Sequence, residues 1–182
     1  MRELDKQSLS PVIFSILLTN YDQTVRNLAG PDEDALVAVI AERLSRAIPQ
    51  KMIHARISKN EFACFTHMVS GHAQAVKQIQ AWCQVLTQPF HLAGKVIYLK
   101  AFAGLSPAPP GGNFAALLKE SLLAADYAAT QGRDQVMVYN PDIQKAARDA
   151  DYMLSCLRQA VANDELIVYY QPIVDIVTGA IV

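Results

Sequence analysis

The sequence predicts an α+β fold, in which helices return across one mixed sheet in a ferredoxin-like arrangement. The first observation is the order of its segments, which read as strand, helix, hairpin, helix, strand, helix and strand from their apolar periodicity. The second is its size, because 182 residues with 52% hydrophobic content can bury one good core but not two domains of ordinary size. We therefore expect one domain followed by an appendage.

The first part of the chain contains a strand, a helix and a hairpin. Residues 12–18 are almost continuously apolar and rich in β-formers, which predicts a central strand buried on both faces. A helix follows, because apolar side chains recur at helical spacing over 36–47, between a cluster of acids and Pro49. Two apolar runs, 52–57 and 62–69, flank a short polar stretch and predict a hairpin.

The next part repeats the pattern of helices and strands. An amphipathic helix follows the hairpin, with Trp82 packed beside its apolar stripe. Residues 95–102 alternate in the manner of a strand, and the stretch 104–113, rich in glycine and proline, predicts a loop. A third helix ends at Gly132, and residues 136–139 predict a short closing strand. The apolar positions of the two helices are Val76, Ile79, Cys83 and Leu86 in the first, and Phe114, Leu117, Leu118, Leu122 and Ala125 in the second.

Residues 141–162 predict a connector helix. Asp142 suits its start, and one apolar stripe continues over about five turns at 3.6 residues per turn. This helix either links two domains or packs as a plain amphipathic helix on its own domain. The stripe consists of Ile143, Ala146, Ala147, Ala150, Met153, Leu154, Leu157 and Val161.

Beyond the helix, residues 163–182 predict a truncated β-hairpin. A strand-like run at 166–170 is followed by a break at Pro172, a second short run at 173–175 and a turn at Thr178-Gly179. Because two isolated strands are marginally stable in water, we expect the chain to stop inside a second domain.

Charge, cysteine spacing and apolar runs narrow the range of partners. The net charge is −1, with 16 Lys and Arg against 17 Asp and Glu, so nothing predicts a nucleic-acid partner. Cys64, Cys83 and Cys156 lack the spacing of a disulfide framework or a zinc site, and we expect buried thiols in a reducing compartment. The run 11–18 is too short to cross a bilayer and no secretory leader precedes it. We therefore expect a cytoplasmic location and no membrane insertion by this segment.

The predicted hairpin carries a family resemblance. Its residues Arg56-Ile57-Ser58-Lys59-Asn60-Glu61-Phe62-Ala63 resemble the signature hairpin of the GGDEF family, the diguanylate cyclases, with both glycines and the acidic third position replaced. The order of segments is similar to a GGDEF domain across residues 11–139. The resemblance implies a nucleotidyl-cyclase-like sheet and a degenerate GGDEF domain over residues 1–140.

The resemblance implies where a cyclase would hold two divalent ions beside its GTP. The family uses an aspartate at the end of the first strand and an acid at the third place of the signature, because hard cations prefer anionic oxygen ligands. Asn20 or Thr19 stands at the first place, and Asn60 stands at the second. We therefore expect no metal site and no metal cofactor in this chain.

The family's phosphate contacts are carried over in the same way. Ser58 and Lys59 replace the glycines whose backbone approaches the phosphates. Lys59 either reaches a phosphate or is a solvated lysine at a hairpin tip. Ala129 stands where the family has a phosphate-binding lysine, while Arg133 is retained.

Two further family sites concern guanine and the inhibitory product. Asp34 matches the aspartate that reads guanine, or it is one more acid at a helix start. Asn27 matches the second guanine contact, across a loop that is shorter than usual. The product site upstream of the signature falls on residues 49–52, which have neither its arginine nor its aspartate.

A second resemblance lies in the tail. Leu157-Arg158-Gln159-Ala160 and the later run Tyr170-Gln171-Pro172-Ile173-Val174-Asp175 resemble the opening of an EAL domain, the cyclic di-GMP phosphodiesterase and receptor fold. Residues 163–182 would then be an N-terminal fragment of that domain. Gln171 either points toward the ligand or is a polar residue at the edge of a half-buried strand. Mg is expected only in an intact EAL domain of a longer parent protein.

These features predict a catalytically inactive GGDEF-type regulatory module that modulates an adjoining EAL domain. Such a module would have GTP, cyclic di-GMP, a second copy of the chain or another protein as possible partners. The alternative is the regulatory half of an active cyclic di-GMP phosphodiesterase, with GTP as an allosteric ligand. Residual cyclase activity is the least favoured, because the family's metal carboxylates and phosphate lysine are replaced.

Overall fold

The computed structural model describes residues 10–49, 52–68, 72–107, 112–132 and 135–181. Residue contacts divide the chain into two units, Met1–Ala147 and Arg148–Val182. Within the described ranges, none of the helices combines the length and the apolar character that crossing a bilayer requires.

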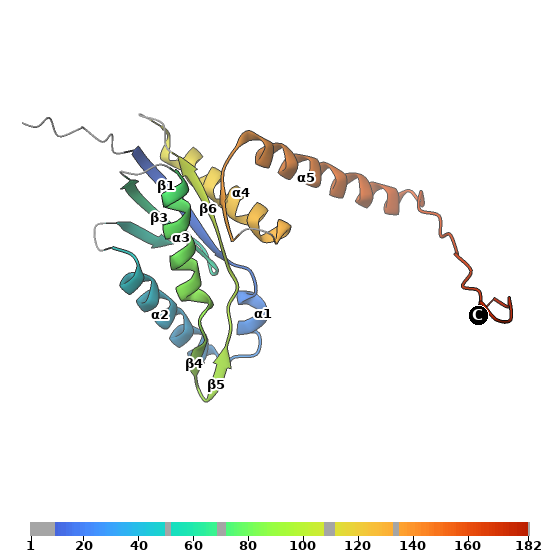
Figure 1. The fold of residues 1–182 in the computed structure, drawn as a ribbon, viewed down its shortest axis with the longest axis horizontal. Helices are drawn as coiled ribbons and strands as arrows, with labels where there is room; N and C mark the ends of the chain where they lie inside the picture. Colours follow the sequence, from blue (N-terminus) through green and yellow to red (C-terminus); the bar gives the residue numbers. More distant parts are fainter. Residues whose placement is uncertain (1–9, 50–51, 69–71, 108–111, 133–134, 182) are drawn as a thin grey trace, which may run out of the picture. The chain divides into compact units, whose positions relative to one another are not determined.

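A five-stranded sheet forms the centre of the first unit (Figure 1). Its order is β2-β3-β1-β6-β7, with antiparallel neighbours except for the parallel pair β6–β7. This mixed sheet with flanking helices confirms the predicted α+β fold class. The strands are β1 (Ser10–Leu18), β2 (Ile53–Arg56), β3 (Glu61–Met68), β6 (Ala101–Pro107) and β7 (Val136–Val138).

Helices cover both faces of this sheet (Figure 1). α2 (Gly30–Ala47) and α3 (His72–Thr87) pack on one face, and α4 (Phe114–Gln131) packs on the other. β1 lies in the middle and is buried on both sides, which explains its nearly continuous apolar sequence. The short helix α1 (Tyr21–Val25), which the sequence pattern did not predict, follows β1 almost at once.

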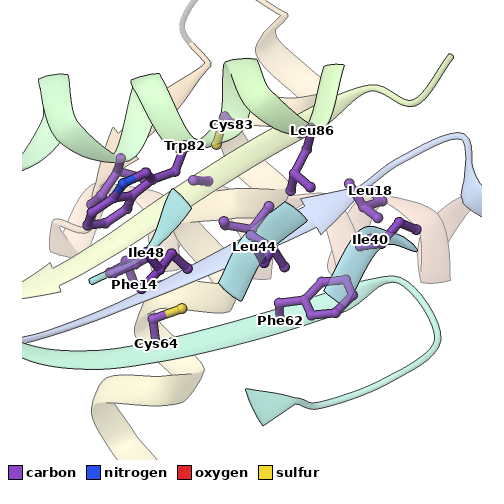
Figure 2. Packing of buried hydrophobic residues seen from close by; sticks show 14 of the residues in the cluster. Phe14, Leu18, Ile40, Leu44, Ile48, Phe62, Cys64, Trp82, Cys83 and Leu86 are labelled. Carbon is purple, nitrogen blue, oxygen red and sulfur yellow. The ribbon is translucent and has the colours of Figure 1, made fainter. Parts of the chain in front are cut away.

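The main core lies between the sheet and the helices α2 and α3. Figure 2 shows Phe14 of β1 beneath Trp82 of α3, whose rings stack with centroids 5.2 Å apart. The predicted stripes of α2 and α3 are confirmed, because Leu44 and Leu86 are among the side chains that they bury, whereas Phe114 of the stripe predicted for α4 is 55% exposed and corrects that part of the prediction. Phe62 of the hairpin belongs to the same cluster (Figure 2).

On the opposite face, α4 approaches the sheet closely at Gly104. A Cβ atom at this position would overlap the carbonyl oxygen of Ser121 and the backbone nitrogen of Ala125. Ser15 of β1 and Ser121 of α4 share a buried hydrogen bond of 2.6 Å between their hydroxyl oxygens. α4 ends as predicted at Gly132, whose φ of 64° is the left-handed conformation that favours glycine.

The prediction of one strand over 95–102 is wrong. Residues 95–97 form β5 (Lys95–Ile97), which pairs with β4 (Phe90–Leu92) in a separate two-stranded sheet. Ala93 and Gly94 connect these strands with φ values of 48° and 74°, which is the geometry of a tight two-residue hairpin. Ala-Gly is a weak sequence signal for such a turn, so the break was missed.

The predicted loop over 104–113 is also placed too early. β6 continues through Gly104 to Pro107, and residues 108–111 lie outside the described ranges. Gly104, which was predicted to lie in this loop, instead allows α4 to pack closely on β6. The glycine is required by tertiary packing, which the local sequence does not reveal.

α5 (Pro141–Ala162) has the bounds predicted for the connector helix. Asn140 precedes it and accepts hydrogen bonds from the backbone N–H groups of Asp142 and Ile143, at 3.0 and 3.2 Å. Ile143 is buried, whereas the later stripe residues Met153, Leu154, Leu157 and Val161 are exposed.

The predicted strand at 166–170 is absent from the described tail, and so is a complete hairpin. One isolated bridge joins Val174 and Ile181, and the predicted turn at Thr178-Gly179 is present between them. The apolar side chains of 166–170 are exposed, so no core stabilises a strand there.

Candidate functional site

The end of β1 and the tip of the β2–β3 hairpin meet at one end of the sheet. The backbone N–H of Leu18 donates to the carbonyl oxygen of Asn60 at 2.9 Å, and the amide Nδ2 of Asn60 donates to the carbonyl oxygen of Leu18 at 3.3 Å. The structure therefore brings the predicted third signature place beside the end of the first strand.

Asn20 follows β1 and holds the segment that leads into β6. Its Nδ2 donates to the carbonyl oxygen of Tyr98 at 2.8 Å, and its Oδ1 accepts from the backbone N–H of Lys100 at 2.7 Å. The same backbone region is fastened by the N–H of Thr19, which donates to the Lys100 carbonyl oxygen at 3.1 Å. The Asn20 amide thus acts as a bracket between two backbone segments.

The two amide groups are poorly suited to bind a divalent ion. Each uses its N–H group to donate to a backbone carbonyl oxygen, which a carboxylate cannot do. The Oδ1 of Asn20 already accepts from Lys100, and the Oδ1 of Asn60 accepts from the hydroxyl of Ser58 at 3.2 Å. Among the described residues there is no group of three or more His, Cys, Asp and Glu that could hold a metal ion.

The hairpin tip is closed by an arginine that the sequence pattern did not single out. The guanidinium of Arg56 donates to the carbonyl oxygen of Lys59 at 2.6 Å, whereas Ser58 and the Lys59 side chain are exposed. Arg56 also approaches the hydroxyl of Tyr21 at 3.5 Å, and that hydroxyl donates to Glu33 at 3.3 Å. The tip is therefore joined to α1 and α2 through one small polar network.

Tyr21 is the buried member of this network. Its pKa is raised above the ordinary tyrosine value because burial disfavours the phenolate. The positive charge of Arg56 lowers the pKa in part, and the carboxylate of Glu33 raises it. Tyr21 therefore stays neutral and works as a hydrogen-bonding link.

A second carboxylate lies near Glu61, the acid of the signature that remains. Burial raises the pKa of Asp126 on α4, and the nearby charge of Glu61 raises it further. The two carboxylates therefore lie close enough to repel each other. Their surroundings among the described residues supply no third acid, histidine or cysteine.

An open pocket of about 520 Å³ lies between α1 and the end of β5. Asn20, Asn27 and Lys95 line it, and Lys95 Nζ donates to the carbonyl oxygen of Asn27 at 3.1 Å. Asp34 is exposed on α2 and is not among the lining residues. The two predicted guanine contacts are therefore not brought together in this pocket. Its lining mixes polar and apolar side chains, and Lys95 is the one charged residue among those that line it.

The remaining predicted site residues have separate positions. Phe62 is 6% exposed and belongs to the core. Gln171 is exposed in the tail, in a stretch without regular structure. Arg133 lies outside the described residues, so its predicted phosphate contact stays a prediction. Of the three predicted buried thiols, Cys64 and Cys83 are buried and Cys156 is partly exposed, which corrects the prediction for Cys156.

Comparison with known proteins decides the family. The family model described as "Diguanylate cyclase, GGDEF domain" matches residues 5–135. The chain belongs to the GGDEF family. The GGDEF domain of TpbB, or YfiN, from Pseudomonas aeruginosa has the same fold, with a TM-score of 0.70 and 18% identity over 77% of this chain and 83% of that one.

Curated relatives extend this likeness to longer proteins. The uncharacterized protein y4lL of Sinorhizobium fredii is 31% identical over 149 residues, which cover 81% of this chain and 18% of the relative. The cyclic di-GMP phosphodiesterase NbdA of Pseudomonas aeruginosa is 25% identical over 165 residues, or 90% of this chain and 21% of the relative. The chain thus spans about a fifth of the length of these two relatives.

Proposed function

We propose that this GGDEF domain is catalytically inactive and acts as a regulatory module of a cyclic di-GMP signalling protein, where it modulates an adjoining EAL domain. The observation that carries the proposal is the pair of amides at the two places where the family holds metal ions. Asn20 and Asn60 are neutral, and both hold backbone groups of the fold. A cyclase needs anionic ligands there to neutralise a triphosphate and activate a hydroxyl.

The hairpin supports the same conclusion. Its tip has lost the glycines that let a backbone approach phosphates, and Arg56 instead fastens the tip onto itself. Phe62 is still present and packs in the core, so the hairpin keeps its structural role. The hairpin thus has the packing of a folded domain without the groups that a cyclase uses to hold phosphates and metal ions.

The second candidate is the regulatory half of an active cyclic di-GMP phosphodiesterase, with GTP as its allosteric ligand. The similarity to NbdA, a protein named as a cyclic di-GMP phosphodiesterase, favours this candidate. The likeness of the tail run Tyr170 to Asp175 to an EAL opening favours both candidates. They differ in whether GTP binds to this domain.

A cyclase assay tests the first candidate. The chain is incubated with GTP and either Mg²⁺ or Mn²⁺, and cyclic di-GMP is measured by chromatography. We expect no product from the natural chain, and none from Asn20→Asp/Asn60→Asp, because the latter restores two carboxylates without the phosphate lysine. Product that disappears in Glu61→Ala would show that the domain is a cyclase.

Titration calorimetry separates the two candidates. GTP is titrated into the chain in EDTA and then in excess Mg²⁺, with ATP as the matched nucleotide control. Saturable binding of GTP but not ATP supports the allosteric candidate, and its loss in Asn27→Ala or Asp34→Ala would assign the predicted guanine contacts. No heat with either nucleotide supports a module that acts through protein contacts alone.

A further inference from the structure

The pocket between α1 and the β4–β5 hairpin has two ends, and a contact to a backbone carbonyl oxygen marks each of them (Figure 1). At one end Asn20 Nδ2 donates to the carbonyl oxygen of Tyr98 at 2.8 Å. At the other end Lys95 Nζ donates to the carbonyl oxygen of Asn27 at 3.1 Å. The helical rise over the residues from Asn20 to Asn27 is on the order of 10 Å. A ligand in the pocket would therefore meet different chemistry at its two ends.

The first end presents an aromatic ring. Tyr98 is 64% exposed, although Ile97 and Leu99 on either side of it are buried. Its backbone is fixed by the hydrogen bond from Asn20. An exposed aromatic ring on a fixed backbone is a surface on which a nucleic-acid base can stack. This end of the pocket thus favours a flat, conjugated group.

The second end presents a cation. The ammonium group of Lys95 has three N–H groups, and Asn27 accepts from one of them. Lys95 forms no ion pair among the described residues, and the residues that line the pocket include no Asp or Glu. A phosphate group could accept from the remaining N–H groups and would balance the charge of the lysine.

The stretch between the two ends suits the middle of such a ligand. Ile97 is buried and Leu28 packs against the core, so these two side chains give the pocket an apolar wall. The amide of Gln23 also lines the pocket, and it offers both a donor and an acceptor. A volume of about 520 Å³ lies within the range of sites for small molecules.

The charge of the pocket selects the number of phosphates. A nucleoside triphosphate carries several negative charges and normally a magnesium ion, which prefers carboxylate oxygen ligands. Lys95 is the one charged residue that lines the pocket, so no carboxylate there can share a metal ion. A single phosphate group matches one lysine and needs no metal ion.

We propose that this pocket binds a purine nucleoside monophosphate without a metal ion, with its base on Tyr98 and its phosphate on Lys95. This goes beyond the regulatory role proposed above, which does not depend on it. Asp34 and the signature residues 58–62 do not line the pocket, and Lys95 contacts Asn27 through its backbone carbonyl. Because the pocket is open and its cation is exposed, the dissociation constant should be on the order of 0.1–1 mM.

Nuclear magnetic resonance of the ¹⁵N-labelled intact chain tests the site. GMP and AMP are titrated in EDTA while the backbone N–H signals are followed, and guanosine and inorganic phosphate probe the two halves of the ligand. We expect saturable shifts at residues 20–28 and 95–98, with affinities for GMP and AMP within about threefold, because stacking tolerates either purine. Each half should bind more weakly than GMP. The absence of shifts up to about 10 mM GMP, or shifts confined to residues 58–62 and to the start of α2, would overturn the proposal.

Matched variants separate the two ends of the pocket. Tyr98→Ala should weaken GMP binding at least fivefold, whereas Tyr98→Phe, which keeps the ring, should leave it within about twofold. Lys95→Gln should weaken it about threefold to tenfold, and Lys77→Gln, at an exposed lysine of α3 outside the pocket, is the control. Circular dichroism verifies that each variant remains folded.

The same variants show which result contradicts the site. GMP binding that Lys95→Gln and Tyr98→Ala leave unchanged would overturn the proposal. Loss of GMP binding in Asp34→Ala but not in Lys95→Gln would assign the nucleotide to the predicted guanine contact of the family, and would overturn it as well. Neither result bears on cyclase activity, which the assay with GTP and a divalent ion measures separately.

Discussion

Phe62 and Asn60 lie two residues apart in the same hairpin, yet they differ in what they have kept. Phe62 is 6% exposed and packs in the core shared by β1, α2 and α3, as the resemblance to the family implies. Asn60 replaces an expected acid and binds the backbone of Leu18. The difference teaches that the apolar frame of this fold does not depend on the charges that the family uses for catalysis. The following changes test each side of the comparison.

Gly104→Ala should have the largest effect, because it disrupts the packing of α4 on the sheet. The new Cβ would overlap backbone atoms of Ser121 and Ala125, so α4 must move away from the sheet. We expect the free energy of unfolding to fall by about 3 kcal/mol or more, measured by urea denaturation. Gly30→Ala is the matched control, since its added Cβ meets no atom within 4 Å, and it should change stability by less than about 1 kcal/mol. Equal effects of the two changes would contradict the close approach.

Asn20→Asp should have the next largest effect, because it removes one of the two hydrogen bonds by which the Asn20 amide joins two backbone segments. The carboxylate still accepts from the Lys100 N–H, but its second oxygen faces the carbonyl oxygen of Tyr98. We expect a loss of about 1–2 kcal/mol in the free energy of unfolding. Asn113→Asp is the control, because Asn113 only accepts, from the N–H of Ala115 at the start of α4. A stabilised Asn20→Asp chain would show that the site still favours an acid.

Tyr21→Phe should have a smaller effect. It removes the hydroxyl that donates to Glu33 and lies 3.5 Å from Arg56, while it keeps the buried ring. Both contacts are long, so we expect a loss of about 0.5–1 kcal/mol, measured by thermal unfolding. Thr24→Val is a comparison at the same helix, where the lost hydroxyl donates at 2.8 Å to the carbonyl oxygen of Asn20. No loss in Tyr21→Phe would mean that the network does not hold the tip.

Asp126→Asn should have the smallest effect, and it should be stabilising. Burial and Glu61 raise the folded-state pKa of Asp126, so its charged form is disfavoured in the folded chain. The folded chain is favoured over the unfolded chain while Asp126 is protonated. This stabilisation is fully present below the pKa of Asp126 in the unfolded chain, and it is lost as the pH rises through its pKa in the folded chain. The variant should therefore melt slightly above the natural chain at pH 7 and match it near pH 3. A gain that grew toward low pH would contradict this origin.

The sequence predicted the fold where periodicity and packing agree. The stripes of α2 and α3 were readable because their buried side chains recur at helical spacing, and the end of α4 was readable because Gly132 suits a left-handed helix end. The β4–β5 hairpin was missed because Ala93-Gly94 is an atypical tight turn, and β6 was shortened because Gly104 serves a tertiary contact. A strand at 166–170 failed to form because a strand needs partners that the described residues do not supply.

The candidate site was predictable only in part. The positions of Asn20 and Asn60 followed from the resemblance, and the structure brings both to the same end of the sheet. Their backbone contacts were not predictable, because the partners Tyr98 and Lys100 are distant in sequence. Arg56 was missed because an exposed arginine beside a turn carries no periodic signal. Asp34 and Asn27 remain predictions as guanine contacts.

Electron paramagnetic resonance of Mn²⁺, titrated into the chain with and without GTP, tests the central claim most directly. Free Mn²⁺ gives a strong signal that binding suppresses, so the measurement counts bound ions without relying on catalysis. If amides bonded to backbone have replaced the metal site, the free signal of the chain alone should rise in proportion to added Mn²⁺. With GTP present it should match the signal of protein-free GTP at the same concentration, because GTP itself binds Mn²⁺, and Glu61→Ala should behave as the natural chain does in both arms. Saturable Mn²⁺ binding that is lost in Glu61→Ala or Asn60→Ala would contradict the account.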